Sequence, residues 1–238
     1  MTPSTDANGG KPRTLPEPYY DCDGIRIFHA RCEDVLPHVD PASVGLLLTD
    51  PPYGIDLDTD YSKFRDKRIA DVGPDYGRRV TGDAAAFDPV PLLHFRRVFL
   101  FGANHYHHRL PEGGSWFVWD KVTRNDVTVR QADGELAWHN AGGKNCVIRR
   151  HMWVGAFRDS ERNTALHPTQ KPVSLMRWIV ERWTEPGDLV LDPYMGSGPI
   201  AQACYELGRR YIGCEIVEDY CATAVKRLSQ QVLPLEPA

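Results

Sequence analysis

The residues with the clearest chemical potential in this sequence are Asp50, Pro51, Pro52 and Tyr53, which directly follow the apolar run Val44–Leu48. Two consecutive prolines stiffen the backbone and remove two amide donors, so the carbonyl groups there are left to accept hydrogen bonds. A carboxylate, a rigid acceptor carbonyl and an aromatic ring together can receive a planar base that carries an NH2 group. Asp and Pro are also common turn residues, so an ordinary strand-to-loop turn is the alternative.

A second segment with chemical potential runs from Asp188 to Gly198 and reads Asp-Leu-Val-Leu-Asp-Pro-Tyr-Met-Gly-Ser-Gly. It predicts a buried strand, a glycine-rich turn and then a helix whose first amides are free. Glu215 ends the next apolar run, where a carboxylate can bind the two hydroxyls of a ribose. The unit indicates a site for an adenosine-containing cofactor without saying which one, because Gly196-x-Gly198-x-x-Ala201 also fits a loose dinucleotide fingerprint. A purely structural turn is the other alternative.

A third segment, His-Pro-Thr-Gln-Lys-Pro at residues 167–172, stands at the entrance of a predicted helix. Thr169 is suited to cap that helix, and Lys171 places a cation beside the carboxyl end of the strand predicted over Leu189–Asp192. A helix start flanked by proline is common, so this segment also has a purely structural interpretation.

The elements that must position these residues alternate between short apolar runs and helical patterns. Continuously apolar runs are typical of strands that are buried on both faces of a parallel sheet. The strands are predicted at Gly24–His29, Val44–Thr49, Val98–Phe101, Trp116–Trp119, Leu189–Asp192 and Tyr211–Glu215, and the helices at Val173–Trp183 and Ile200–Leu207. This alternation predicts an α/β fold with helices on both faces of the sheet, and ligands at the carboxyl ends of the strands.

The chain is expected to form a single domain over residues 19–238, because no internal repeat or second core is visible. Residues 1–18 are polar and proline-rich without an apolar core, which predicts a disordered leader rather than a secretory signal. Two stretches, at about 54–82 and 120–165, show little periodicity and are predicted to be irregular, functional loops.

Composition narrows the class of protein. Hydrophobic residues make up 42% and charged residues 25%, as in ordinary globular proteins. No run approaches the roughly 18 apolar residues that a membrane span needs, so we expect a cytoplasmic protein without a membrane partner. The six cysteines form no Cys-x-x-Cys pair and are expected to be reduced thiols. His105, His107 and His108 have no further ligand type at metal spacing, so no metal is expected.

The charge is unevenly distributed along the chain. The net charge is −4, yet residues 59–165 hold 17 Lys and Arg against 13 Asp and Glu, while the rest holds 11 against 19. The basic middle third, with clusters at Lys63–Arg68, Arg78–Arg79 and Arg149–Arg150, is where a surface that contacts phosphates is expected. A mixed, solvated surface explains the same charge equally well.

The three segments occur in an order that resembles the amino-methylating DNA methyltransferases of the circularly permuted beta group, in which the catalytic motif precedes the cofactor motif. The likeness runs from about Gly24 to Leu228. It implies the three-layer, Rossmann-like methyltransferase fold with a mostly parallel central sheet, S-adenosylmethionine as cofactor and double-stranded DNA as partner, with a homodimer left open. Resemblance to compact, phage-associated members is carried by Phe101–Asn104, Trp116–Lys121 and Glu135–Trp138.

The resemblance implies roles for matching residues. Asp50 and the backbone at Pro51, stiffened by Pro52, would accept hydrogen bonds from the target amine while Tyr53 stacks on a flipped base. On the cofactor side, it implies contacts from Cys32, Thr169, Lys171, Asp192, Tyr194, Gly196, Gly198 and Glu215. We expect the carboxylates of Asp192 and Glu215 to reach the cleft. Members of the group usually carry Gly-Asp-Cys where this chain has Ala30-Arg31-Cys32, and Pro199 replaces their usual Thr.

The preferred target is N6 of adenine, because the cytosine enzymes of the group usually carry Ser before Pro-Pro-Tyr where this chain has Asp50. N4 of cytosine is the alternative. A catalytically silent DNA-binding protein, suggested by Arg31, and a nicotinamide oxidoreductase are further alternatives. The oxidoreductase would leave the segments at residues 50–53 and 167–172 unexplained.

Overall fold

The structure is a computed structural model that describes residues 14–56, 81–123, 132–143, 145–154, 157–160 and 170–229. The strands are β1 (Tyr20–Cys22), β2 (Ile25–His29), β3 (Val44–Thr49), β4 (Val98–Phe101), β5 (Ser115–Asp120), β6 (Gly134–His139), β7 (Cys146–Arg150), β8 (Trp153–Val154), β9 (Phe157–Arg158), β10 (Leu189–Asp192) and β11 (Arg210–Glu215). The α-helices are α1 (Cys32–Val35), α2 (Ala103–Tyr106), α3 (Val173–Trp183), α4 (Pro199–Glu206) and α5 (Glu218–Ser229). Short 3₁₀ turns lie at Leu36–His38, Pro41–Ser43, Val90–Leu92 and His107–Arg109.

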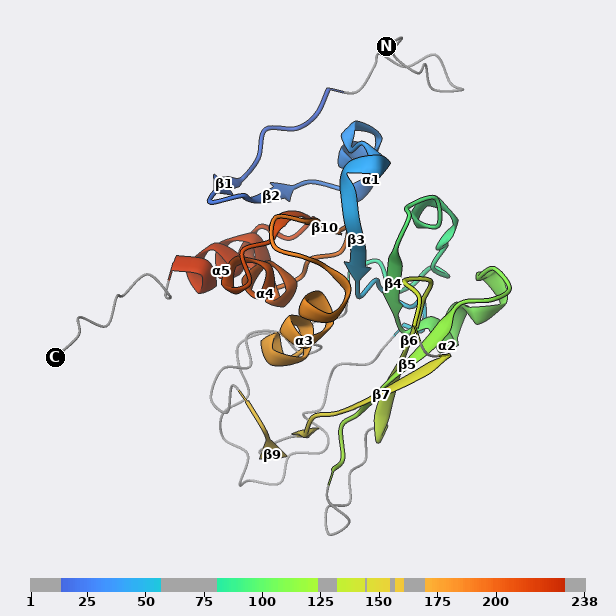
Figure 1. Ribbon diagram of the computed structural model, residues 1–238. Helices are drawn as coiled ribbons and strands as arrows, with labels where there is room; N and C mark the ends of the chain where they lie inside the picture. Colours follow the sequence, from blue (N-terminus) through green and yellow to red (C-terminus); the bar gives the residue numbers. More distant parts are fainter. Residues whose placement is uncertain are drawn as a thin grey trace, which may run out of the picture.

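The main sheet has nine strands in the order β1-β2-β11-β10-β3-β4-β6-β5-β7 (Figure 1). Strands β2, β11, β10, β3 and β4 run parallel. Strand β6 is antiparallel between β4 and β5, and β7 runs parallel to β5. Strand β1 is antiparallel to β2 at the opposite edge. The predicted α/β fold with a mostly parallel sheet is confirmed.

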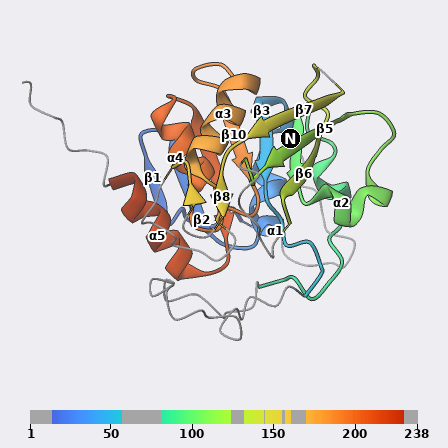
Figure 2. The same ribbon diagram turned by 90° about the horizontal axis from the view of Figure 1, so that it is seen from below.

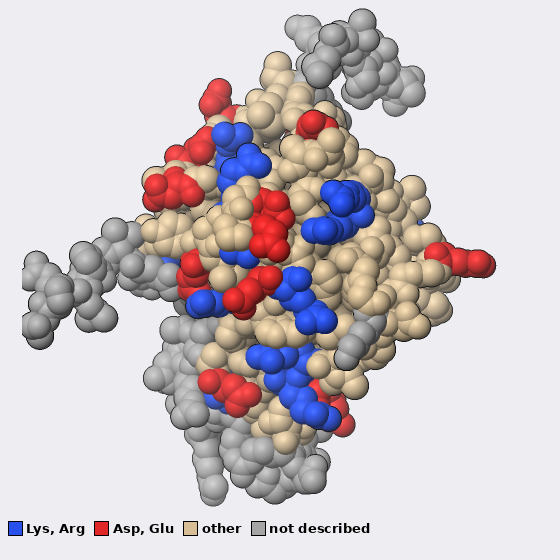
Figure 3. All heavy atoms as spheres, in the orientation of Figure 1, with Lys and Arg blue, Asp and Glu red and all other residues tan. Residues whose placement is uncertain are grey.

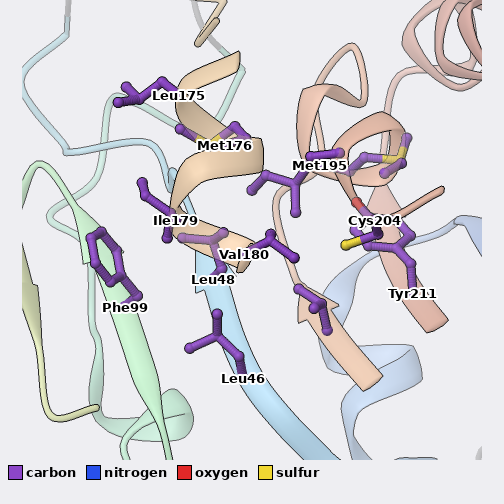
Figure 4. Close-up of a cluster of buried hydrophobic side chains, with 14 of the residues drawn as sticks. Leu46, Leu48, Phe99, Leu175, Met176, Ile179, Val180, Met195, Cys204 and Tyr211 are labelled. Carbon is purple, nitrogen blue, oxygen red and sulfur yellow. The ribbon is translucent and has the colours of Figure 1, made fainter. Parts of the chain in front are cut away.

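Helices cover both faces of this sheet, which gives three layers (Figures 1 and 2). Side chains of a strand alternate between faces. In β3, Leu46 and Leu48 pack with α3, α4 and α5, as Figure 4 shows beside α3, while Leu47 packs on the other face with α2. Each Leu side chain buried in this way stabilises the fold by about 1.5–3 kcal/mol. The three-layer arrangement therefore follows from a strand whose consecutive leucines bury apolar side chains on both faces.

The six predicted strands and two predicted helices are all present, each within one residue of its predicted bounds. The prediction of an irregular stretch over residues 120–165 is wrong where β6 and β7 form. Residues 57–80 of the other predicted loop, and residues 1–13 of the predicted leader, lie outside the described residues. Within the part of the chain that the structure describes, no helix is long and apolar enough to cross a membrane.

The sheet topology brings the predicted site residues to one edge. Parallel strands end at the same edge, so the chain leaves β2, β3, β4, β10 and β11 on the same side. Because β6 is antiparallel to β4, the beginning of β6 lies at this edge as well. Residues that are far apart in the sequence meet there.

Candidate active site

A cleft of about 660 Å³ opens at the carboxyl edge of the sheet. Eight of the predicted site residues line it: Cys32, Asp50, Pro51, Pro52, Tyr53, Tyr194, Gly196 and Glu215. Lys171, Asp192 and Gly198 are described but do not line it, and Thr169 lies outside the described residues. The cleft therefore joins the Asp50–Tyr53 segment to the glycine turn after β10.

A hydrogen-bonded anchor fixes the loop that follows β3. The Asp83 carboxylate accepts hydrogen bonds from the amides of Gly54 (2.7 Å) and Ile55 (3.4 Å). Gly54 has φ of +77°, and a Cβ there would collide with the backbone of Ala85. Asp83 is buried, so these two bonds are protected from water. The segment that contains Asp50 and Tyr53 is thus pinned at its far end.

The Tyr53 side chain lies folded against the protein. Its hydroxyl donates to Asp50 Oδ1 at 2.5 Å, and its ring stacks on the His105 imidazole with a centroid distance of 5.1 Å and an interplanar angle of 14°. Gly102, at φ of +67°, allows this position because a Cβ there would overlap the Tyr53 ring. One face of Tyr53 is therefore already occupied by an aromatic neighbour.

Asp50 stands at the end of a chain of charged side chains. Its Oδ2 accepts from the Lys171 ammonium, which also lies 3.1 Å from Glu135 Oε2. Glu135 Oε1 in turn accepts from Lys121 Nζ at 2.9 Å. Burial raises the pKa of Asp50 and the Glu135 carboxylate adds to this, while the Lys171 cation lowers it; the net shift is upward. Lys171 is itself held protonated, since its two carboxylate partners raise its pKa against the effect of burial.

At the other end of the cleft, Glu215 organises the glycine turn. Its Oε2 accepts from the Gly196 amide at 2.9 Å and its Oε1 from the Val217 amide at 2.8 Å. Each oxygen retains a lone pair that can accept from a hydroxyl group. Burial raises the pKa of Glu215. A Cβ added at Gly196, which has φ of +56°, would meet no atom of the described residues within 4 Å, so the backbone there is open to the cleft. These groups suit a ribose and the chain attached to it.

Gly198 has a packing role in the structure, in addition to the cofactor contact that the resemblance implies for it. A Cβ at Gly198 would lie 2.6 Å from the Ala224 Cβ on α5, so its missing side chain allows α5 to pack closely. Its φ of +77° also suits the residue before α4. Of the two glycines, Gly196 faces the cleft and Gly198 supports the helices.

The third wall of the cleft combines a thiol with polar groups. Burial raises the pKa of Cys32 to about 11, so it is present as the thiol. Its Sγ lies 3.6 Å from Glu33 Oε2, and Glu33 pairs with Arg31 at 3.3 Å. Tyr194 packs edge-to-face on Phe87 at 5.8 Å. Arg31, at the position where the resemblance implies Asp, thus lines the cleft and is paired with Glu33.

The expectation that Asp192 reaches the cleft is wrong. The residue is completely buried, and its carboxylate accepts from Thr49 Oγ1 at 2.6 Å and from the Tyr211 hydroxyl at 3.0 Å. Burial raises its pKa to about 7 in spite of these bonds. Asp192 therefore joins β3, β10 and β11 beneath the cleft floor.

Sequence reasoning gave no role to Asp83, Glu135, Lys121 or His105. Asp83 lies in a segment without a periodic pattern, so no local signal marks it. His105 stood out only as one of three neighbouring histidines, and nothing in the sequence indicates that its ring stacks on Tyr53. Glu135 and Lys121 belong to the segments Glu135–Trp138 and Trp116–Lys121, which resemble compact members of the group. The sequence did not indicate that the two side chains are in contact. Among residues 14–56, 81–123, 132–143, 145–154, 157–160 and 170–229, no group of His, Cys, Asp or Glu is arranged to hold a metal ion.

Comparisons with known proteins place the chain among DNA-modifying enzymes. A family model described as DNA methylase matches residues 114–226. YubD of Escherichia coli (strain K12), which its name describes as a methylase, is 44% identical over 230 aligned residues, covering 86% of this chain and 90% of YubD.

Solved structures show the same fold. A DNA modification methylase of Thermus thermophilus, complexed with S-adenosyl-L-methionine, superposes with a TM-score of 0.54 at 17% identity, covering 88% of this chain and 95% of that protein. The PvuII DNA methyltransferase, described as cytosine-N4-specific, gives a TM-score of 0.56 at 16% identity, with 90% and 88% of the two chains covered.

Proposed function

The chain belongs to the family of DNA methyltransferases that modify N6 of adenine or N4 of cytosine, and on that premise we propose that it methylates N6 of adenine in double-stranded DNA. The observation that carries the proposal is the cleft that Asp50 and Tyr53 share with Gly196 and Glu215. One end of this cleft suits a planar base with an amino group, and the other suits an adenosine cofactor. We place the reaction in the cytoplasm.

S-adenosylmethionine is the cofactor of this family, and the described residues fit it. The cleft volume of about 660 Å³ leaves room beside the open backbone at Gly196. Glu215 presents the acceptors for two ribose hydroxyls, and Cys32 and Tyr194 line the adjoining wall. When bound, the cofactor supplies an activated methyl group on its sulfonium. The order of the Asp50 and Gly196 segments supports membership of the permuted beta group.

The residues at the other end supply orientation. The lone pair of an exocyclic amine is delocalised into the ring, so the amine is a weak nucleophile. The Asp50 carboxylate and the Pro51 carbonyl would each accept a hydrogen bond from one N–H of the target amine. These two hydrogen bonds would direct the lone pair of the amine toward the methyl group. Positioning and preorganised electrostatics then provide most of the acceleration. A base in a duplex must first leave the stack, which costs roughly a few kcal/mol and which an aromatic platform such as Tyr53 offsets in part.

Asp50 also supports adenine over cytosine, since the cytosine enzymes of the group usually carry Ser at this place. The likeness to the cytosine-N4-specific PvuII enzyme concerns the fold alone. The deciding experiment incubates the purified protein with labelled S-adenosylmethionine and mixed-sequence duplex DNA, and then analyses the digested nucleosides. N6-methyladenine is the expected product. N4-methylcytosine alone would reassign the target, and no labelled nucleoside at all would refute the proposed activity.

The role of Asp50 is tested with Asp50→Asn, which keeps an oxygen that can accept from Lys171. Loss of one preorganised contact at a reacting centre costs on the order of 10²–10³ in rate, so single-turnover transfer should fall by that factor. Affinity for S-adenosylmethionine, measured by calorimetry, should stay within threefold. Asp88→Asn is the matched control, because Asp88 is another cleft carboxylate but caps Val90 instead. An Asp50→Asn protein as fast as this control would remove Asp50 from the mechanism.

A further inference from the structure

A row of four alternating charges lies at the carboxyl edge of the sheet. Asp50 contacts Lys171, Lys171 lies 3.1 Å from Glu135, and Glu135 lies 2.9 Å from Lys121. Only 6% of the Lys171 side chain is exposed, against 11% for Lys121, 22% for Asp50 and 27% for Glu135. The aromatic rings of Phe101 and Trp119 lie 5.2 and 5.5 Å from the two ammonium groups.

The four charges come from four elements, so the contact depends on the whole fold. Asp50 follows β3, Lys121 follows β5, Glu135 lies at the start of antiparallel β6, and Lys171 precedes α3. Two carboxylates and two ammonium groups balance one another. Taking an ion out of water costs several kcal/mol unless a partner compensates it, so each member of the row needs its neighbours.

Only one member of the row faces the cleft. Asp50 lines it, while Lys171, Glu135 and Lys121 do not. The Asp50 oxygens are fixed from two sides, Oδ1 by the Tyr53 hydroxyl and Oδ2 by Lys171. Each oxygen keeps a second lone pair, so the carboxylate can still accept from an amine. A carboxylate held in this way presents its free lone pairs to the cleft in one orientation.

We propose that Lys171 is a positioning residue for the Asp50 carboxylate, with Glu135 and Lys121 holding Lys171 in place. This inference rests on the proposed function and deepens it. It differs from the role that the family resemblance implies for Lys171, which is contact with the carboxylate of the cofactor. The Lys171 ammonium is already engaged by two protein carboxylates and lies outside the cleft lining.

The row also controls the protonation of Asp50. Among the described residues, the titratable groups that act on it or lie around it are Tyr53, Tyr106, Glu135, Lys171 and Asp192, with Lys121 behind Glu135. The ionised carboxylate is a stronger acceptor for an amine N–H than the protonated carboxyl group, in which one oxygen carries a proton and donates instead. At low pH the rate of methyl transfer should fall as Asp50 becomes protonated, and this fall is the acid limb of the pH profile. Lys171 lowers the pKa of Asp50 and Glu135 raises it. Removing the Lys171 charge should therefore move the acid limb to higher pH, and removing the Glu135 charge should move it to lower pH.

The test compares Lys171→Met, Lys171→Arg and Glu135→Gln with wild type, measuring the single-turnover transfer rate from pH 5 to 9. A nearby opposite charge shifts a pKa by about 1–3 units, so Lys171→Met should move the acid limb up by about that amount. Its rate near neutral pH should fall on the order of 10²-fold. Glu135→Gln should move the limb down, and Lys171→Arg should restore part of the rate. Lys226→Met, at an exposed site on α5, is the matched control and should behave as wild type.

Calorimetry with S-adenosylmethionine and a thermal melt accompany each rate profile. Affinity within threefold of wild type in Lys171→Met supports the proposal, whereas a large loss of affinity with an unmoved acid limb would assign Lys171 to the cofactor and overturn it. If Lys171→Met does not fold, the pH at which the acid limb lies in Lys171→Arg and Glu135→Gln tests the proposal instead. A wild-type protein that binds the cofactor but methylates no DNA refutes the proposed function. A wild type that methylates while the variants keep its profile refutes this inference alone.

Discussion

At the scale of single residues, three carboxylates at the same edge of the sheet have three different environments. Asp50 faces the cleft and pairs with a lysine, Glu215 faces the cleft and holds two backbone amides, and Asp192 lies beneath the floor. The sequence places all three at strand ends but contains no information on which way each side chain points. That direction depends on partners such as Thr49 and Tyr211, which lie 143 and 19 residues away from Asp192.

Asp192 makes stability depend on pH. Its pKa in the folded protein is raised to about 7 from an ordinary 3.8, so the folded state binds the proton more tightly than the unfolded chain. The stabilisation from Asp192 is therefore largest below pH 4. It declines by up to about 1.4 kcal/mol per pH unit as the pH rises to about 7, and it is constant at higher pH. Asp192→Asn imitates the protonated form. The free energy of unfolding of Asp192→Asn should therefore increase relative to that of the wild type as the pH rises from 5 to 7.

Denaturant unfolding at half-unit pH intervals measures this difference. Asp40→Asn is the control, because Asp40 caps the turn at Pro41–Ser43 from an exposed position and Asn caps equally well. The control should run parallel to wild type. A difference between Asp192→Asn and wild type that stays constant over the range would show that Asp192 is ionised throughout.

At the scale of elements, the sequence predicted the buried strands and helices better than the half-exposed ones. Strands β3 and β10 contain the continuously apolar runs Val44–Leu48 and Leu189–Leu191, and helix α3 repeats its apolar residues at helical spacing, so local sequence specifies them. Strand β7 is half exposed at the sheet edge and ends in two arginines, so it lacks that signal. Strand β6 begins with Gly134 and Glu135, which favour a loop locally, and forms because β4 and β5 pair with it on both sides. The charge row was therefore beyond sequence reasoning, since it requires the position of β6.

The connection between β4 and α2 offers a test of how elements position the site. Gly102→Ala would place a Cβ within the Tyr53 ring, at a residue with φ of +67°, so Tyr53 must move. Single-turnover methyl transfer should fall by at least 10-fold. Affinity for S-adenosylmethionine should stay within threefold, because the hydrogen bonds of Glu215 to the Gly196 and Val217 amides do not involve Tyr53. Gly142→Ala is the matched control. It has φ of +82° with no described atom near its Cβ, so it adds only backbone strain of about 1–2 kcal/mol. Equal rates in the two variants would show that the position of the Tyr53 ring does not matter for methyl transfer.

At the scale of the whole molecule, a net charge of −4 must be reconciled with a polyanionic substrate. On the face seen in Figure 3, Lys and Arg side chains are spread among acidic groups, and some of them lie where α3 and β7 lie in Figure 1. Strand β7 divides its two arginines between faces. Arg149 lies over the Trp178 ring of α3 at 5.1 Å, whereas 73% of the Arg150 side chain is exposed. Of this pair, Arg150 is therefore the one exposed enough to reach a phosphate, although it pairs with Asp120. The clusters at 63–68 and 78–79 lie outside the described residues.

The salt dependence of DNA binding tests this placement. Each phosphate that a cation neutralises contributes about −0.9 to the slope of log affinity against log salt. Arg150→Gln should make the slope shallower by about that amount, measured by fluorescence anisotropy between about 50 and 200 mM salt. Arg26→Gln is the matched control: Arg26 pairs with Asp21 at 2.9 Å as Arg150 pairs with Asp120 at 3.2 Å, but it lies at the opposite end of the sheet. If both variants keep the wild-type slope, the phosphates are bound elsewhere; if both lose the same increment, the protein attracts DNA through its overall charge. Only a shallower slope in Arg150→Gln without a change in Arg26→Gln would show that the duplex lies along β7. Arg150 is at the carboxyl end of β7, which is the end of the sheet where Asp50 also lies.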